Sequence, residues 1–223
     1  MKFILLVSFL IGFVACHPWD PVPRTDSYWV NKHKSFLQTT KQHANDIHLL
    51  FYGDSITEGW AGNGKNVWKQ YYGNLHAYDY GIGGDKTENL VYRIGSGEVA
   101  NLHPKVVVLM IGTNNLASDS VQDISKGVKA VVDLLDSKLP NSKILLLAVL
   151  PRSTYNDKVK QLNNLISKFH NGNSVTFLSM NSHFEDAKGI HSDLYVEGLH
   201  LNEKGYKVWA QTMEPTLKKL LGN

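Results

Sequence analysis

Three side chains in this sequence could together carry out nucleophilic catalysis at a carbonyl group. Ser55 ends a Gly-Asp-Ser tripeptide that directly follows an apolar run, Leu49 to Tyr52. His200 could take the proton of this serine, and Glu197, three residues earlier, could orient the imidazole. Acyl transfer through an activated serine requires a nucleophile, a base and an acid that holds the base. We therefore take Ser55, His200 and Glu197 as candidate catalytic residues.

Donors for a developing oxyanion occur in the same kind of position along the chain. Two further strand-like runs end in Gly83-Gly84-Asp85 and in Gly112-Thr113-Asn114-Asn115. The backbone N–H groups of Ser55 and Gly84 and the side-chain amide of Asn114 could donate to an oxyanion. Glycine at position 84 lets a substrate approach the backbone closely, and an amide donates without carrying a charge. These three residues form the candidate oxyanion hole.

A purely structural explanation exists for Gly-Asp-Ser taken alone, because all three residue types favour turns and helix N-caps. Two observations favour catalysis over a structural turn. Glycine followed by polar residues recurs at the end of three apolar runs, and a histidine, His200, lies near the end of the chain. Asp54 and Asp85 are expected to stabilise turns and helix N-termini around the site rather than to transfer protons.

The elements that must position these residues alternate along the chain. Strands are expected over 47–52, 77–82, 105–111, 143–150 and 174–180. Helices are expected over 27–44 and 87–94, from about 120 to 140, over 159–169, and from an N-cap at Asn202 with an interruption at Pro215. This order predicts an α/β fold: a three-layer α/β/α sandwich with a five-stranded parallel sheet in flavodoxin-like order. Ser55, Gly84 and Asn114 would then meet at one edge of the sheet, where ligand crevices lie.

The composition is that of one ordinary globular domain. The chain has 223 residues, of which 43% are hydrophobic and 19% charged, and its formal net charge is +3. Scattered Lys and Arg residues and this mild charge argue against a nucleic-acid partner. Trp68, Tyr71 and Tyr72 are expected in the core, and for most of the aromatic residues that could form a sugar platform, Trp60, Trp68, Tyr71 and Tyr155, the core is also the favoured place. Four polar residues that could be imagined as metal ligands form no recognisable motif: His183, Glu185, Asp186 and His191.

The first 16 residues are typical of a secretory signal peptide, because Lys2 precedes an apolar stretch too short to anchor the chain across a bilayer. The mature domain would then comprise residues 17–223, without a transmembrane segment. In a bacterium, Cys16 could instead be kept as a lipidated first residue. Cys16 is the only cysteine, so a chain that begins at His17 would contain no disulfide.

Four blocks in order make the chain resemble the SGNH (GDSL-type) hydrolases: Gly53-Asp54-Ser55, Gly81 to Asp85, Gly112 to Asn115, and the acid-x-x-His segment ending at His200. Within that family it is most similar to the catalytic subunits of platelet-activating-factor acetylhydrolase Ib, through 80–87, 91–94 with Gly97-Glu98, and 104–108. The resemblance implies the SGNH hydrolase fold. It also implies an ester hydrolase for small acyl chains, often a deacetylase of lipids or carbohydrates, that uses Ser55 and His200 without a metal or organic cofactor.

One residue departs from the family pattern, which has Asp where this chain has Glu197. A glutamate can still orient a histidine, since both acids occur in serine hydrolase triads. We therefore expect a secreted serine esterase that hydrolyses short-chain, acetyl-type esters of a lipid or carbohydrate through an acyl-enzyme intermediate. Assembly as a homodimer stays open. The alternative is a catalytically weakened, secreted ligand-binding protein on the same fold, although a binding protein has no need of Ser55, Gly84, Asn114 and His200 together.

Overall fold

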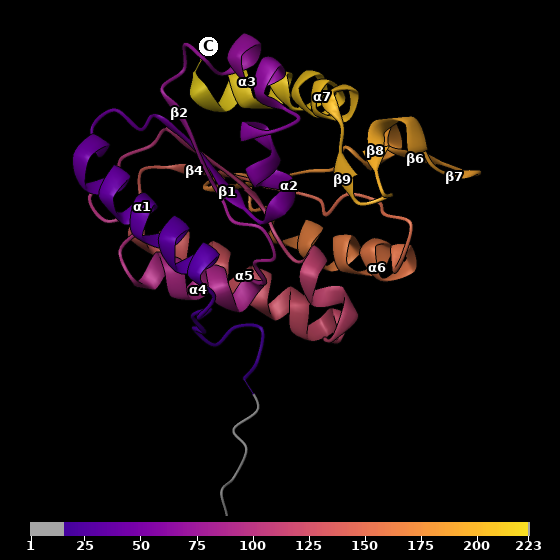
Figure 1. The fold of residues 1–223 in the computed structure, drawn as a ribbon, viewed down its shortest axis with the longest axis horizontal. Coiled ribbons are helices and arrows are strands. Elements are labelled where there is room, and N and C mark those ends of the chain that lie inside the picture. The colour runs from indigo at the N-terminus through magenta and orange to yellow at the C-terminus, as the bar shows by residue number, and fades with distance from the viewer. Residues whose placement is uncertain (1–15, 223) are drawn as a thin grey trace, which may run out of the picture.

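The computed structural model describes residues 16–222, which build one parallel sheet with helices on both faces (Figure 1). The strands are β1 (Leu49–Gly53), β2 (Ala77–Gly81), β3 (Val106–Met110), β4 (Lys143–Leu147) and β5 (Val175–Leu178), and they lie in the order β2-β1-β3-β4-β5. All neighbouring pairs are parallel. The predicted flavodoxin-like order is confirmed.

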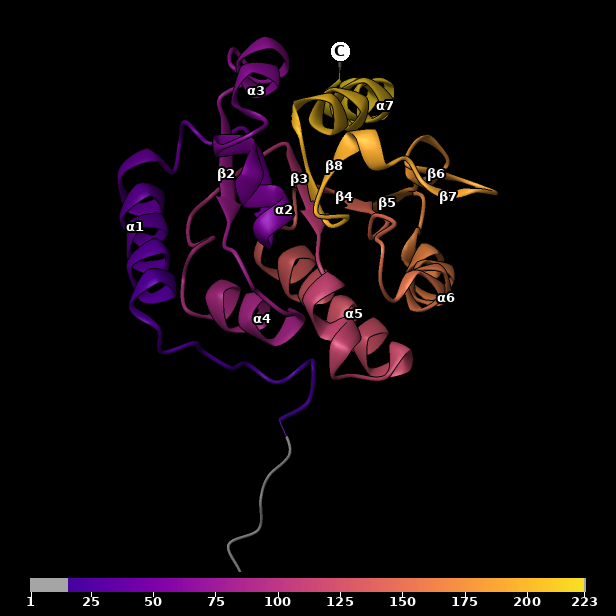
Figure 2. The ribbon, with the colours of Figure 1, turned by 45° about the vertical axis from the view of Figure 1, so that its right-hand side comes forward.

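Two layers of helices enclose the sheet. On one face lie α1 (Ser27–His43), α4 (Thr87–Gly95), α5 (Val121–Lys138) and α6 (Asn156–Ile166), while α3 (Lys65–Tyr71) and α7 (Glu203–Leu221) cover the other (Figure 2). Along β1, Leu50 and Tyr52 pack toward α1 and α4, whereas Leu49 and Phe51 pack toward α3 and α7. Strands buried on both faces explain the unbroken apolar runs in the sequence.

The register of the sheet aligns the carboxyl ends of β2, β1 and β3, so that the loops after these strands begin next to one another. Gly53 at the end of β1 pairs with Gly81 of β2 and with Met110 of β3. The chain therefore leaves the three central strands at adjacent points, and the segments that begin at Asp54, Ile82 and Ile111 start side by side. The short helix α2 (Ser55–Glu58) follows β1 directly.

Helix α7 corrects one expectation, because it runs from Glu203 to Leu221 without an interruption at Pro215. The predicted N-cap is present, since the Asn202 side chain accepts a hydrogen bond from the Gly205 N–H at 3.1 Å. A proline removes one helical hydrogen bond and crowds the carbonyl four residues earlier. Here that residue is Gln211, which like Pro215 is exposed, so water can satisfy the released carbonyl.

Short elements between β5 and α7 were not predicted. They are the antiparallel pairs β6 (Glu185–Asp186) with β7 (Gly189–Ile190) and β8 (Tyr195–Val196) with β9 (His200–Leu201). Two-residue strands are too short to show a period in sequence. Five 3-10 segments complete the described chain: Gly59–Ala61, Thr113–Ala117, Ser167–Phe169, Asn181–His183 and Ser192–Leu194.

The lead into α1 spans residues 17–26, in which a turn at residues 17–20, where the Asp20 N–H donates to His17 O at 2.9 Å, is followed by an extended segment. It packs across the start of α4, where the Val22 N–H donates to Glu88 O at 3.1 Å and Asn89 Nδ2 donates to Val22 O at 2.9 Å. The predicted signal peptide lies outside the described residues except for Cys16, which is exposed. No helix within residues 16–222 is both long enough and apolar enough to cross a membrane.

Candidate active site

Ser55 lies at a tight turn between β1 and α2. Asp54 caps α2, because its Oδ1 accepts a hydrogen bond from the Ile56 N–H at 2.9 Å. A Cβ on Gly53 would lie 2.3 Å from Thr57 Oγ1 and 2.4 Å from Met110 O, so only glycine fits before the cap. Burial raises the pKa of Asp54 to about 7. The turn leaves Ser55 half-buried at the carboxyl edge of the sheet.

His200 is the group that faces this serine. Its Nε2 lies 3.0 Å from Ser55 Oγ, which is hydrogen-bond distance between residues 145 positions apart in the chain. The histidine begins β9, and Asn63 Nδ2 anchors the same strand by donating to Leu201 O at 3.0 Å. The geometry is that of a serine whose proton can pass to an imidazole.

Glu197 occupies the turn that joins β8 to β9. The Leu199 N–H donates to Val196 O at 3.2 Å, and the two central residues have positive φ, 54° at Glu197 and 68° at Gly198. This is the backbone that tight hairpin turns require, and glutamate adopts it less readily than Asp or Asn. The Glu197 side chain is exposed, and among residues 16–222 no hydrogen bond joins it to His200. Its role as the acid of a triad stays a prediction.

The candidate oxyanion donors lie around Ser55. A methyl group built on Gly83 would be 3.8 Å from Ser55 Cβ, so the loop after β2 passes beside the serine. Gly84 is exposed with φ +81°, and Asn114 Nδ2 donates to Asp85 O at 2.9 Å, which ties the loop after β3 to the loop after β2. Within the described chain, the backbone N–H groups of Ser55 and Gly84 donate to no other residue. Both remain available for a substrate.

A fully buried ion network that no sequence motif predicts lies behind this loop. Arg93 Nη1 lies 2.7 Å from Asp85 Oδ2, and its Nη2 lies 2.8 Å from Glu98 Oε2. Burial raises the pKa of Asp85 to about 6, and the facing guanidinium of Arg93 opposes that rise. Asp85 therefore supports the loop through side-chain contacts with Arg93 and Trp29, rather than by capping a helix N-terminus as predicted.

Glu58 and Arg24 are two further residues at the site that sequence reasoning did not select. Glu58 Oε2 accepts a hydrogen bond from the Gly83 N–H at 2.8 Å, and Arg24 Nη1 donates to Gly83 O at 2.6 Å. Burial opposes the charged form of Glu58, but hydrogen bonds from Lys32, Tyr28 and the Gly83 N–H outweigh it and hold the pKa of this carboxyl below its usual range. No motif links these positions, since the fold alone brings them to the loop.

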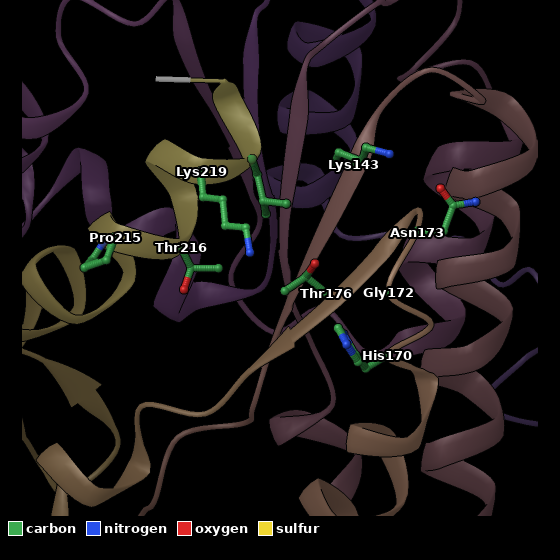
Figure 3. A pocket seen from close by; sticks show the side chains of 9 residues that line it. Lys143, His170, Gly172, Asn173, Thr176, Pro215, Thr216 and Lys219 are labelled. Atoms are coloured by element: carbon green, nitrogen blue, oxygen red, sulfur yellow. The ribbon is translucent and has the colours of Figure 1, made fainter.

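A cleft of about 700 Å³ lies at the other end of the sheet (Figure 3). Its lining comes from the start of β4, from β5 and the segment before it, and from the end of α7, and includes Lys143, Thr176 and Lys219. Amino ends of parallel strands lie opposite their carboxyl ends, so this cleft is separate from Ser55 and His200. Within residues 16–222, no three His, Cys, Asp or Glu side chains are placed to share a metal ion.

Comparison with known proteins agrees with the geometry. The model of the GDSL-like lipase/acylhydrolase family matches residues 51–208. Human platelet-activating factor acetylhydrolase IB subunit alpha1 is 30% identical over 203 residues, with 88% of this chain and 85% of the relative covered. The bovine alpha2 subunit is 28% identical over 202 residues, with 88% and 86% covered.

Solved structures show the same fold at low identity. A GDSL-like lipase from Bacteroides thetaiotaomicron superposes with a TM-score of 0.70 at 19% identity, covering 84% of this chain and 98% of that chain. A carbohydrate esterase family 3 protein from Talaromyces cellulolyticus superposes with a TM-score of 0.58 at 16% identity, covering 79% and 98%. At these identities the likeness concerns the fold.

Proposed function

This chain belongs to the GDSL-like lipase/acylhydrolase family and is a carboxylic ester hydrolase, and from that premise we propose that it removes short, acetyl-type acyl groups through an acyl-enzyme on Ser55. The observation that carries the proposal is the 3.0 Å separation of His200 Nε2 from Ser55 Oγ, beside the backbone N–H groups of Ser55 and Gly84, which have no acceptor among residues 16–222.

The proposed reaction has two steps. Ser55 Oγ bonds to the ester carbonyl carbon while its proton passes to His200 Nε2, and the carbonyl oxygen becomes an oxyanion facing the N–H groups of Ser55 and Gly84 and the amide of Asn114. The bond to the alcohol then breaks, and the alcohol leaves with the proton held by His200. Water attacks the acyl-serine with His200 again as base, which releases the acid and restores Ser55.

The acetyl preference is supported by the relatives of this chain, which are subunits of platelet-activating factor acetylhydrolase IB. Charged side chains bound to the loops that carry the oxyanion donors support it as well. Glu58 accepts a hydrogen bond from the Gly83 N–H in the loop after β2, and Arg152 Nη1 donates to Thr113 O in the loop after β3 at 3.0 Å, so charged groups lie beside both donor loops, where they would disfavour a long acyl chain. A lipid or carbohydrate alcohol and a homodimeric state stay predictions.

The test is the chain-length dependence of ester hydrolysis. Purified protein is expected to hydrolyse p-nitrophenyl acetate with a kcat/KM about 10-fold or more above that of the octanoate, because each methylene has to be placed against polar groups. Steady-state rates on acetate, butyrate and octanoate measure this. Equal or rising values with chain length would overturn the acetyl preference and leave the esterase assignment standing.

The ligand-binding alternative has one observation in its favour, the exposed Glu197 without a hydrogen bond to His200. If Glu197 completes a triad when substrate is bound, Glu197→Ala should lower kcat by about 10²-fold to 10⁴-fold, and Glu197→Asp should retain activity because aspartate suits a positive φ. Glu203→Ala, at an exposed carboxylate nearby in sequence, is the matched control. A Glu197→Ala enzyme as active as the parent would show that Ser55 and His200 act without this acid.

We also propose that the protein is secreted after removal of residues 1–16. The support is the sequence itself, a lysine followed by a short apolar stretch. Expression of the full chain in a eukaryotic secretory host, followed by mass determination of the protein in the medium, tests the proposal. Protein that stays in the cells with Met1 intact would contradict it.

A further inference from the structure

The peptide bond between Gly83 and Gly84 is clamped by a side chain from the N-terminal lead. Arg24 Nη1 donates to Gly83 O at 2.6 Å. In a trans peptide the carbonyl and the following N–H point to opposite sides of the chain. All peptides of the described residues are trans, so the direction of the Gly83 carbonyl sets the direction of the Gly84 N–H, which points away from the guanidinium. Arg24 thus controls the orientation of a candidate oxyanion donor.

The other polar group of Gly83 is held equally firmly. Its N–H donates to Glu58 Oε2 at 2.8 Å. Glu58 is in turn bound by the Tyr28 hydroxyl and by Lys32 Nζ, the latter at 2.8 Å. With both polar groups of Gly83 paired to charged side chains, the loop has little freedom to rotate. The Gly84 N–H, by contrast, has no acceptor within the described chain.

Arg24 is itself fixed where it lies. Its Nε lies 3.0 Å from Asp26 Oδ2, and its Nη1 lies 3.5 Å from the buried Asp85 Oδ1. A Cβ at position 84 would be 2.9 Å from Arg24 Nη1, so the absence of a side chain at Gly84 lets the guanidinium lie against the peptide. The Arg24 side chain is only 28% exposed, which limits competition from water for the Gly83 carbonyl.

We propose that Arg24 is a positioning residue of the oxyanion hole, acting through the Gly83–Gly84 peptide. The guanidinium orients the Gly84 N–H, and its charge polarises the peptide so that this N–H becomes a stronger donor as the oxyanion forms. The proposal rests on the proposed function. It makes the extended lead, which carries neither nucleophile nor base, part of the catalytic apparatus.

Substitution of Arg24 tests the proposal. Arg24→Met, of similar length but without charge or donors, is expected to lower kcat for p-nitrophenyl acetate by about 10-fold to 100-fold, less than the 10²-fold to 10³-fold that loss of a donor costs. KM should stay within about threefold, because the oxyanion exists only in the transition state. Arg24→Lys, which keeps the charge and one donor, should recover most of the rate. Lys34→Met, at an exposed lysine of α1, is the matched control.

A second measurement separates positioning from a general effect on folding. A small alkylboronic acid forms a tetrahedral adduct with an active-site serine, and its inhibition constant should rise in Arg24→Met by the factor by which kcat/KM falls. If Arg24→Met does not fold, Arg24→Gln takes its place and is expected to lower kcat by about threefold to tenfold. An active parent whose folded Arg24 variants keep kcat and boronate affinity within twofold overturns this proposal alone. A parent inert on every ester overturns the proposed function, and this proposal with it.

Discussion

Ser55→Ala is expected to lower kcat on p-nitrophenyl acetate by about 10⁴-fold to 10⁶-fold, because the nucleophile and its base act as one unit. Ser55 Oγ is the atom that faces His200 Nε2 at 3.0 Å, and the substitution leaves that imidazole without a proton to accept. Residual hydrolysis should then come only from the oxyanion donors and from substrate binding. Initial rates of parent and variant at saturating ester measure the loss.

Two controls make this result specific. Ser192→Ala, at an exposed serine of the same chain, should keep full activity. The melting temperature of Ser55→Ala should match that of the parent, since the half-buried hydroxyl makes no other hydrogen bond to the described residues. A p-nitrophenyl phosphonate should label the parent once, on the peptide that contains Ser55. Labelling elsewhere, or equal rates in parent and variant, would contradict the assignment of the nucleophile.

Arg93→Met is expected to cost about 3 to 5 kcal/mol in the free energy of unfolding, the range found when one partner of a buried ion pair is removed. The guanidinium is fully buried, lies between Asp85 and Glu98, and donates to Tyr80 O at 2.6 Å. The guanidinium carbon, Arg93 Cζ, lies 4.7 Å from the centre of the Tyr52 ring, which adds a cation–π contact. Without the arginine, the buried Asp85 keeps only the longer contact with Arg24 Nη1, at 3.5 Å, and the buried Glu98 keeps only His33 as a basic partner.

Urea unfolding followed by circular dichroism measures this loss. The matched control is Lys129→Met, which removes an exposed ion pair with Asp133 at 2.7 Å and should cost less than about 1 kcal/mol. A double variant, Arg93→Met with Glu98→Gln, should recover part of the loss because it removes one of the stranded charges. A cost for Arg93→Met no larger than that of Lys129→Met would show that the network is not important for stability.

Most of the fold could be predicted from the sequence because the strands are buried on both faces. The runs from Leu49 to Tyr52 and from Val106 to Ile111 are apolar at every position, and only a sheet covered by two helical layers buries both faces in this way. The exact ends differ, because β1 begins at Leu49 and β3 ends at Met110, whereas Ile47 and Ile111, which are also buried, lie just outside the paired residues. The predicted interruption of the last helix at Pro215 is wrong, because a proline is tolerated inside a helix where the carbonyl that it frees faces water.

The sequence by itself determined which groups could do chemistry. Ser55, Gly84 and Asn114 follow successive strands, and parallel strands bring their carboxyl ends to one edge of the sheet. His200 was recognisable by its acid-x-x-His segment, and the structure places it against Ser55. These residues could be selected in advance because local pattern and topology are enough to place them.

Only the tertiary structure decided how those groups are held. Arg24 reaches Gly83 from the extended lead, Glu58 reaches the same glycine from α2, and Arg93 joins Asp85 to Glu98 beneath the loop. The tertiary structure also places Glu197 in a hairpin turn at positive φ, where no hydrogen bond joins it to His200 among residues 16–222. These contacts join residues by side-chain reach across loops, which no periodicity encodes, because the distance between two loops depends on how every layer beneath them packs.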